Sequence, residues 1–71
     1  MNYEQMLSRL EQGLTIIEGV QGDLDVIAHA YIVAVPAATY SAYSEAQVET
    51  LIKDLGWVWS DEMGWLFSCL G

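Results

Sequence analysis

The sequence predicts an α+β fold that is mostly helical, with three helices followed by a C-terminal β-hairpin in a single small domain, residues 1–71. Three observations support this prediction. Apolar residues recur at helical spacing through the first third of the chain, a capped apolar helix follows in the second half, and two aromatic runs flank a short loop that contains glycine. A chain of 71 residues has no room for two hydrophobic cores.

The first predicted helix begins after Asn2, which can act as the N-cap because a glutamine lies at the capping-box position three residues later. Its apolar face, with alternating steps of four and three residues, consists of Tyr3, Leu7, Leu10, Leu14 and Ile17. Two lengths are open, because glycine weakens a helix. We favour a helix that runs to Gln21 with Gly22 as its C-terminal cap. The alternative stops near Gly13 and leaves residues 14–20 as a strand.

The second predicted helix runs from Leu24 to Val35. Asp23 is suited to cap it, and the alanines in this segment favour a helix. In the alternative, Tyr31–Val35 is a buried strand that forms a three-stranded sheet with the C-terminal hairpin. Periodicity cannot separate the two interpretations in a run that is so uniformly apolar. Pro36 marks the end of the segment or a kink in it.

The third predicted helix, Ser44–Leu55, has the clearest signals in the chain. Ser44 and Gln47 fit a capping box at its start, and Gly56 follows as a C-terminal stop. Its single apolar face consists of Val48, Leu51, Ile52 and Leu55. The tail then changes from helical to strand-like patterning, because residues 57–59 and 65–67 are aromatic-rich runs around a short loop. This pattern predicts a β-hairpin that packs on the helices.

Helix, helix, capped helix and hairpin is the element order of a winged-helix domain. Residues 48–67, in which Leu-Gly-Trp leads into a hairpin that ends Gly-Trp-Leu-Phe, resemble the third helix and wing of that family. The resemblance implies a winged-helix-like shape. Members of the family usually bind DNA through the third helix, but here that helix carries three acidic residues and one lysine. The resemblance therefore implies a version of the winged-helix fold that binds a protein partner instead of DNA.

The charge balance narrows the classes of partner. Ten acidic residues stand against two cations, Arg9 and Lys53, which gives a net charge of −8. Two cations cannot neutralise a row of phosphates, so we expect no direct binding to nucleic acid and no docking on an anionic membrane. Cys69 is the one cysteine, so no intrachain disulfide can form, and a reducing cytoplasmic location is expected.

Catalytic and metal-binding residues are scarce. His29 and Cys69 supply too few nitrogen and sulfur ligands for a zinc site, and no acidic loop matches a calcium-binding motif. The glycines fit no phosphate-binding pattern. We therefore expect no enzyme activity, no cofactor and no metal.

Acidic residues form the first candidate partner-binding set. One group recurs every seven residues along the first helix, a second lies at the break that follows, and a third lies at the hairpin tip. The members are Glu4, Glu11, Glu18, Asp23, Asp25, Asp61 and Glu62. They are interpreted either as a solvated face that keeps an apolar protein soluble or as a surface complementary to a basic groove on a partner.

The aromatic hairpin forms the second candidate set. Trp57 and Trp59 point to one face of their strand, and so do Trp65 and the phenylalanine two residues later on the next strand. These side chains either close the small core or remain exposed as anchors for a partner, together with Met63 at the tip. Stacking on bases needs supporting cations, which this hairpin lacks, so a protein partner is preferred.

The leading hypothesis is a small acidic protein that binds a basic, nucleic-acid-binding surface of another protein and inhibits it sterically and stoichiometrically. In size, charge and lack of catalytic residues the chain is similar in type to phage anti-defence inhibitors, anti-CRISPR proteins among them. The alternative hypothesis is a structural or adaptor subunit that buries its apolar excess in a homo-oligomer, for example a homodimer. In that case the apolar face of the first helix could serve as a coiled-coil seam.

Overall fold

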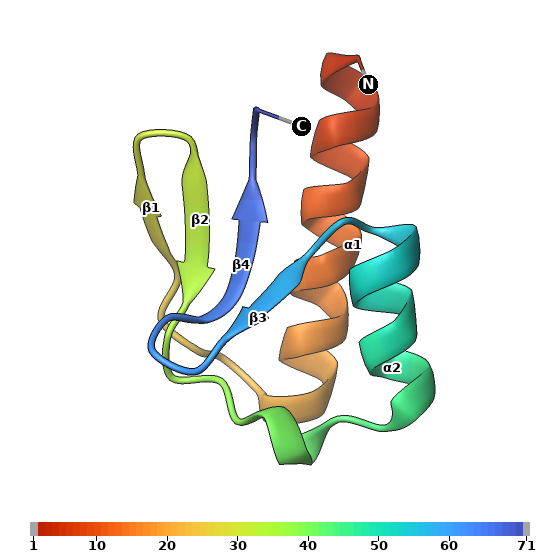
Figure 1. Cartoon of the computed structure of the whole chain (residues 1–71), viewed down its shortest axis with the longest axis vertical. Helices are drawn as coiled ribbons and strands as arrows, with labels where there is room; N and C mark the ends of the chain where they lie inside the picture. Colours follow the sequence, from red (N-terminus) through yellow and green to blue (C-terminus); the bar gives the residue numbers. More distant parts are fainter. Residues whose placement is uncertain (1, 71) are drawn as a thin grey trace.

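The computed structural model describes residues 2–70, which form two helical segments and one four-stranded antiparallel sheet (Figure 1). In chain order the elements are α1 (Tyr3–Gln21), β1 (Ile27–His29), β2 (Ile32–Val35), the 3-10 turn η1 (Tyr40–Ala42), α2 (Glu45–Glu49), η2 (Thr50–Asp54), β3 (Val58–Ser60) and β4 (Gly64–Ser68). The prediction of three helices followed by a C-terminal hairpin is therefore wrong. The strands are spread through the chain, and the sheet has the order β1-β2-β4-β3.

Helix α1 confirms the longer of the two predicted lengths. The Asn2 side chain accepts a hydrogen bond from the Gln5 backbone N–H at 2.8 Å, and the Gln5 side chain accepts one from the Asn2 N–H at 3.3 Å. At the other end the Gly22 N–H donates to the Glu18 carbonyl at 2.7 Å. Both ends of the helix thus satisfy part of the backbone groups that a helix leaves without intrahelical partners.

The predicted second helix is replaced by a hairpin. Strands β1 and β2 pair over Ile27–Ala34, Ala28–Val33 and His29–Ile32. Strand β2 lies inside the sheet because it also pairs with β4. The alternative three-stranded sheet comes closer, since Ile32–Val35 is a strand, but β1 makes a fourth strand. The apolar segment forms a strand because β1 and β4, on either side of it, supply hydrogen-bond partners for its backbone. A local sequence pattern cannot show these partners.

The third predicted helix is confirmed in position. Ser44 caps it, with its hydroxyl accepting from the Gln47 N–H at 3.1 Å and the Gln47 side chain accepting from the Ser44 N–H at 2.9 Å. The segment is α-helical as α2 and then widens to π-type hydrogen bonding in η2, where the Leu55 N–H donates to the Thr50 carbonyl at 3.0 Å.

The C-terminal hairpin, β3 with β4, is also confirmed, but it belongs to a larger sheet. Val35 pairs with both Gly64 and Trp65, which makes a bulge where β2 meets β4. Gly64 has a φ of +70°, and a Cβ atom there would collide with the Val35 carbonyl oxygen. With a hairpin in place of the second helix and four strands in the sheet, the winged-helix resemblance does not hold.

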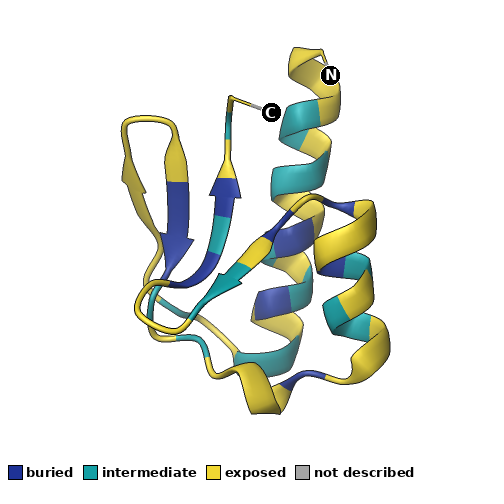
Figure 2. Ribbon diagram, viewed as in Figure 1, coloured by how far each residue is buried: buried dark blue, intermediate teal, exposed yellow. Residues whose placement is uncertain are grey.

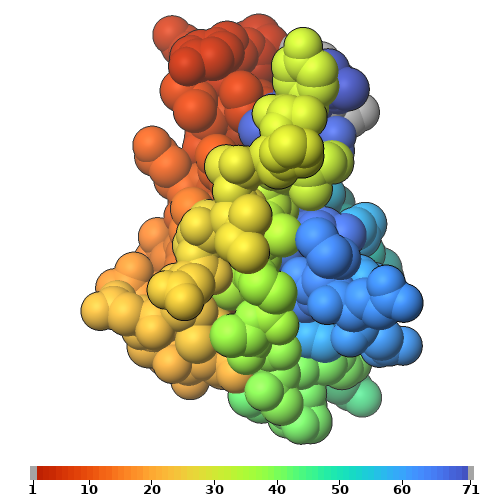
Figure 3. Space-filling view, turned by 90° about the vertical axis from the view of Figure 1, so that its left-hand side faces the viewer, coloured from red at the N-terminus to blue at the C-terminus, as the bar shows by residue number. Residues whose placement is uncertain are grey.

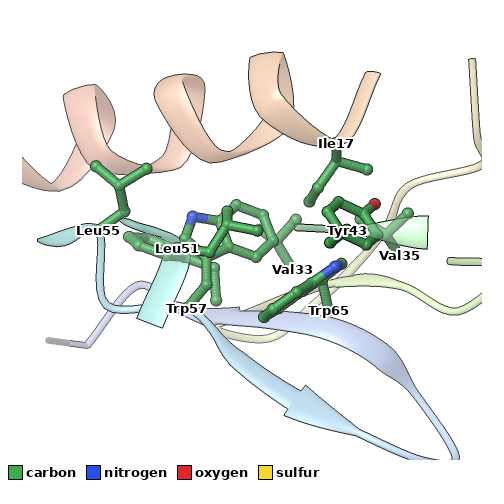
Figure 4. Packing of buried hydrophobic residues seen from close by; sticks show 9 residues of the cluster. Ile17, Val33, Val35, Tyr43, Leu51, Leu55, Trp57 and Trp65 are labelled. Carbon is green, nitrogen blue, oxygen red and sulfur yellow. The ribbon is translucent and has the colours of Figure 1, made fainter. Parts of the chain in front are cut away.

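The two helical segments cover one face of the sheet, and the core lies between the layers (Figures 1, 2 and 4). The buried hydrophobic residues are Ile17, Val33, Ala34, Val35, Tyr43, Leu51, Leu55, Trp57, Trp65 and Phe67. Leu10 and Leu14 pack against this cluster. The apolar face of α1 is therefore occupied within its own chain, and the predicted coiled-coil seam is not free to pair with a second copy.

Gly13 explains why α1 tolerates a glycine in its middle. A Cβ atom at this position would overlap the Trp57 indole. The missing side chain lets the indole pack flat on the helix, where its Nε1–H donates to the Arg9 carbonyl at 3.2 Å. The glycine is thus required by close packing between the helix and the start of β3.

Candidate functional site

The acidic residues of α1 form a row on its solvent-facing flank. Glu4, Glu11 and Glu18 are all exposed and lie seven residues apart on one unbroken helix. A rise of about 1.5 Å per residue places them about 10.5 Å apart, so that the row spans about 21 Å. Because the helix has no break between Tyr3 and Gln21, the spacing of their Cα atoms is set before any partner binds.

The loop after α1 extends this row. A shallow cavity of about 150 Å³ lies between the end of α1 and residues 22–26, and both Glu18 and Asp23 line it. Asp25 is exposed in the same loop. Four of the seven predicted acidic site residues, Glu4, Glu11, Glu18 and Asp23, therefore follow one path along the helix and round its C-terminal end. We call these four residues the acidic row.

The remaining two predicted acids lie at the β3–β4 turn. Asp61 accepts a hydrogen bond from the Trp59 Nε1–H at 3.1 Å, and the Ser60 hydroxyl accepts from the backbone N–H groups of Glu62 and Met63 at 3.3 and 3.1 Å. These bonds shape the turn and leave Met63 44% exposed. In Figure 3 this turn (blue) and the loop after α1 (orange to yellow) lie on opposite sides of the visible face. The structure thus separates the two acidic groups.

Two of the predicted aromatic anchors lie in the core. Trp57 and Trp65 are fully buried, so neither is available to touch a partner in this conformation. The sequence predicted one shared face for the aromatic residues of each strand, and the structure brings the two sets together. Trp59 pairs with Trp65 across the strands at a centroid distance of 5.3 Å, and the rings of Trp57 and Phe67 lie 5.2 Å apart. Trp59 is partly exposed and is the one tryptophan of the hairpin that can reach the surface.

Tyr43 joins the loop before α2 to the end of α1. Its hydroxyl donates to the Gln21 side-chain oxygen at 2.6 Å, and the same oxygen accepts from the Thr39 N–H at 3.1 Å. Burial raises the pKa of the Tyr43 phenol above its ordinary value of 10.0, and the neighbouring Trp65 indole lowers that pKa by a smaller amount. Trp65 Nε1 itself is buried with no hydrogen-bond partner in the described part of the chain. These bonds tie the loop before α2 to the end of α1, and Tyr43 also lines a hollow of about 450 Å³ beside α2.

The sheet face that points away from the helices carries an uncharged apolar row. Cross-strand pairing aligns Ile27 with Ala34, Ala34 with Leu66, and Leu66 with Val58, so that one residue from each of the four strands lies in line. Ile27 is 50% exposed and Val58 is 53% exposed at the two ends, whereas Ala34 is buried between its neighbours. We call these four residues the open-face row.

The open-face row was not predicted from the sequence, although two of its four residues follow from strand alternation in the C-terminal hairpin. Val58 and Leu66 alternate with aromatic residues, and residues that alternate along a strand point to opposite faces. Because Trp57 and Trp59 share one face of their strand, Val58 between them lies on the other face, and Leu66 lies in the same way between Trp65 and the phenylalanine that follows it. Ile27 and Ala34 could not be found in this way, because their segment was predicted to be a helix.

Chemistry that could support catalysis or metal binding is sparse in residues 2–70. No three histidine, cysteine or carboxylate side chains of this part of the chain gather into a metal site. A hollow of about 450 Å³ lies beside α2, and neither His29 nor Cys69 lines it. Both helical segments within residues 2–70 are too short or too polar to cross a membrane.

Comparisons with known proteins were made against family models, curated sequences and solved structures. None of the three gives a match. The function is therefore inferred from the surface of the protein. Two surface features stand out, the acidic row and the open-face row.

Proposed function

We propose that the protein is a small acidic interaction protein that binds a basic surface of a nucleic-acid-binding partner and blocks that surface without chemistry of its own. The observation that carries the proposal is the acidic row, in which four exposed carboxylates follow one helix and its C-terminal end. Within residues 2–70 the one ion pair joins Lys53 to Glu49 at 3.3 Å, so that no carboxylate of the acidic row is neutralised by a side-chain cation.

The dimensions of the row suit this role. A span of about 21 Å corresponds to roughly six nucleotides of one DNA strand at about 3.4 Å each. A positively charged groove built to follow phosphates attracts any rigid line of negative charge. Because three of the four carboxylates are carried by α1 rather than by a loop, little backbone entropy is lost on binding.

In this proposal, long-range charge attraction brings the two proteins together, and local apolar contacts hold the complex. The net charge of −8 accelerates the encounter with a basic partner and makes binding sensitive to salt. Partly exposed Trp59 and Met63 at the β3–β4 turn are the remaining candidates for apolar anchors. A body of 7.9 kDa placed over a nucleic-acid groove excludes the nucleic acid sterically. We propose the stoichiometric mode of action of phage anti-defence inhibitors, of which anti-CRISPR proteins are one kind.

A capture experiment with two matched variants tests the proposal. Tagged wild-type protein is incubated with nuclease-treated bacterial lysate at low and at high salt, and bound proteins are identified by mass spectrometry. The test variant carries Glu4→Gln, Glu11→Gln and Glu18→Gln, and the control variant carries Glu45→Gln, Glu49→Gln and Asp54→Asn, three exposed acids outside the predicted binding set. Each variant changes the net charge from −8 to −5, because three of the ten acids are neutralised.

We expect wild type and the control variant to retain a nucleic-acid-binding protein at low salt, and the test variant to lose it by about tenfold or more in affinity. The purified partner should then release its nucleic acid when one equivalent of wild-type protein is added. Equal loss in both variants would attribute binding to net charge alone and reject the acidic row. Retention that is unaffected by salt would also contradict the proposal.

A further inference from the structure

The open-face row is a feature of the surface that the proposed function does not use. It crosses all four strands on the side of the sheet that no helix covers (Figures 1 and 2). Ile32 is also exposed on this side, because it alternates with buried Val33 along β2. We infer that a second copy of the chain docks on this face, so that two sheets pack face to face in a homodimer.

Charge selects a second copy over a basic partner at this face. All ten carboxylates lie outside the strands, in helices, the loop after α1 and the β3–β4 turn. The residues that point outward from the sheet are the open-face row together with His29, Ile32, Ser60 and Ser68, none of which is acidic. A cationic protein would find no carboxylate to pair with on this face. A second copy presents the same uncharged face, so that no two carboxylates oppose each other within the row.

Shape selects the same occupant. The row has a half-exposed branched residue at each end and, in the middle, Ala34 beside the larger Leu66. A twofold axis in the interface, parallel to the strands, reverses the row in the partner. Each Leu66 then lies over the small Ala34 of the other copy, and each Ile27 lies against the other copy's Val58. The face is complementary to itself, as an isologous interface requires, and packed sheets in proteins have this aligned geometry.

The size of the molecule limits the affinity. Its largest outline is 31 × 24 Å, or about 740 Å² when multiplied out, compared with about 800 Å² per partner in a standard interface. The open face is only part of this outline, because the helices lie beside the sheet in the same view (Figure 1), so the area that it can bury stays below the standard value. The dimer therefore belongs to the weak, transient class, with a dissociation constant of roughly tens to hundreds of micromolar.

Sedimentation equilibrium over a range of protein concentrations tests the dimer. We expect the mass of wild type to rise from 7.9 kDa toward twice that value. The test variant, Ile27→Thr with Val58→Thr, should raise the dissociation constant about tenfold or more. The control variant, Tyr3→Gln with Ile52→Gln, removes two apolar residues that are 71% and 40% exposed on the helical side and should leave the constant unchanged. Melting temperatures in dilute solution show whether each variant remains folded.

Salt separates this proposal from the proposed function. Two copies with a net charge of −8 repel each other, and added salt screens that repulsion. The dimer should therefore strengthen with salt, whereas binding to a basic partner should weaken. A wild-type mass that stays monomeric at about 1 mM and high salt would overturn the dimer and leave the acidic row unaffected. An equal effect of both double variants would overturn it as well.

Cross-linking tests the reversed alignment. The Ile27→Cys and Val58→Cys variants, each made with Cys69→Ser, are mixed in equal amounts and treated with a short bis-maleimide. The reversed row predicts that the product joining the two different variants exceeds either single-variant product by much more than the twofold ratio that random pairing gives. An excess of the products formed by one variant alone would overturn this arrangement, and so would a purely statistical mixture.

Discussion

The two faces of the one sheet differ in almost every respect. On the covered face, Trp65 and Phe67 are fully or almost fully buried. The ring centroid of Trp65 lies 5.3 Å from that of Trp59, and the centroid of Phe67 lies 5.2 Å from that of Trp57. On the open face, small and branched side chains lie in line, and Val58 is more than half exposed. Aromatic side chains lie on the covered face, where they close the core, and small or branched aliphatic side chains lie on the face that no helix covers.

This difference indicates where stability and interaction are located. A small chain buries a limited fraction of its surface, so nearly all of its stabilising contacts lie on the covered face. The open face is free to change without unfolding the protein, and the acidic row lies on neither face of the sheet. Substitutions should therefore divide into those that unfold the protein and those that alter only association.

The largest effect is expected at Gly13, where the covered face meets α1. Gly13→Ala places a methyl group inside the Trp57 indole and should lower the free energy of unfolding by about 3 kcal/mol, because the buried ring must move and its bond to the Arg9 carbonyl is lost. Urea denaturation measures the change. Gly19→Ala in the same helix meets no atom within 4 Å and should stabilise the protein by up to about 1 kcal/mol. Equal effects at both glycines would refute the packing argument.

A matched pair of valines compares the two faces directly. Val33→Thr on the covered face should cost about 2 kcal/mol, because it buries a hydroxyl in a site that is 8% exposed. Val58→Thr on the open face should change the free energy of unfolding by less than about 0.5 kcal/mol, since that side chain is 53% exposed. Both are measured in dilute solution, where the protein is monomeric. A cost at Val58 as large as that at Val33 would show that the open face is covered within the monomer.

Tyr43→Phe tests the link between the loop before α2 and the end of α1. Loss of the 2.6 Å bond to Gln21 should cost about 1 kcal/mol at neutral pH. Because burial raises the pKa of Tyr43 in the folded state, the unfolded state loses its proton first as the pH rises above about 10. The tyrosine's contribution to stability is then complete below that pH and declines above it.

Urea titrations of wild type and Tyr43→Phe between pH 7 and about pH 11 measure this difference. The stability gap between the two proteins should narrow, and can reverse, at the alkaline end. A gap that is constant across the range would mean that the phenol titrates alike in the folded and unfolded chains.

The smallest effect is expected at the tip of the β1–β2 hairpin. Ala30 has a φ of +55°, a conformation that favours glycine. Ala30→Gly should relieve the strain at some entropic cost and stabilise the protein by about 0.5 kcal/mol. Ala28→Gly, two residues earlier in β1, has no positive φ to relieve and should be destabilising. Thermal melts of both variants decide the point, and loss of stability in Ala30→Gly would contradict the argument.

The candidate sites were predictable to different degrees. The positions of the acidic row followed from a seven-residue repeat and a helix with clear ends, and the structure added that Asp23 continues the row. The burial of Trp57 and Trp65 was one of two open interpretations, because the sequence cannot show how deep an aromatic side chain lies. The open-face row required knowledge of which strands are neighbours.

Local chemistry was sufficient for the helices and the final hairpin. Asn2 and Ser44 cap their helices through bonds to residues three positions away, and the strands around the β3–β4 turn alternate within a few residues. Such signals depend on residues only a few positions apart, so they can be recognised in the sequence. The segment from Ile27 to Val35 had no comparable signal, since its apolar side chains fit a helix and a strand equally well.

Tertiary contacts alone determined that the segment from Ile27 to Val35 forms two strands rather than a helix. Strand β2 pairs with β4, more than thirty residues away, through register partners such as Val33 with Phe67. The backbone groups of β2 are satisfied on both sides only when that distant strand is in place, and the bulge at Gly64 adjusts the fit between them. The sequence by itself determined the ends of α1, the ends of the helical segment formed by α2 and η2, and the negative charge of the surface. The pairing of distant strands determined which apolar residues were buried and which formed the open face.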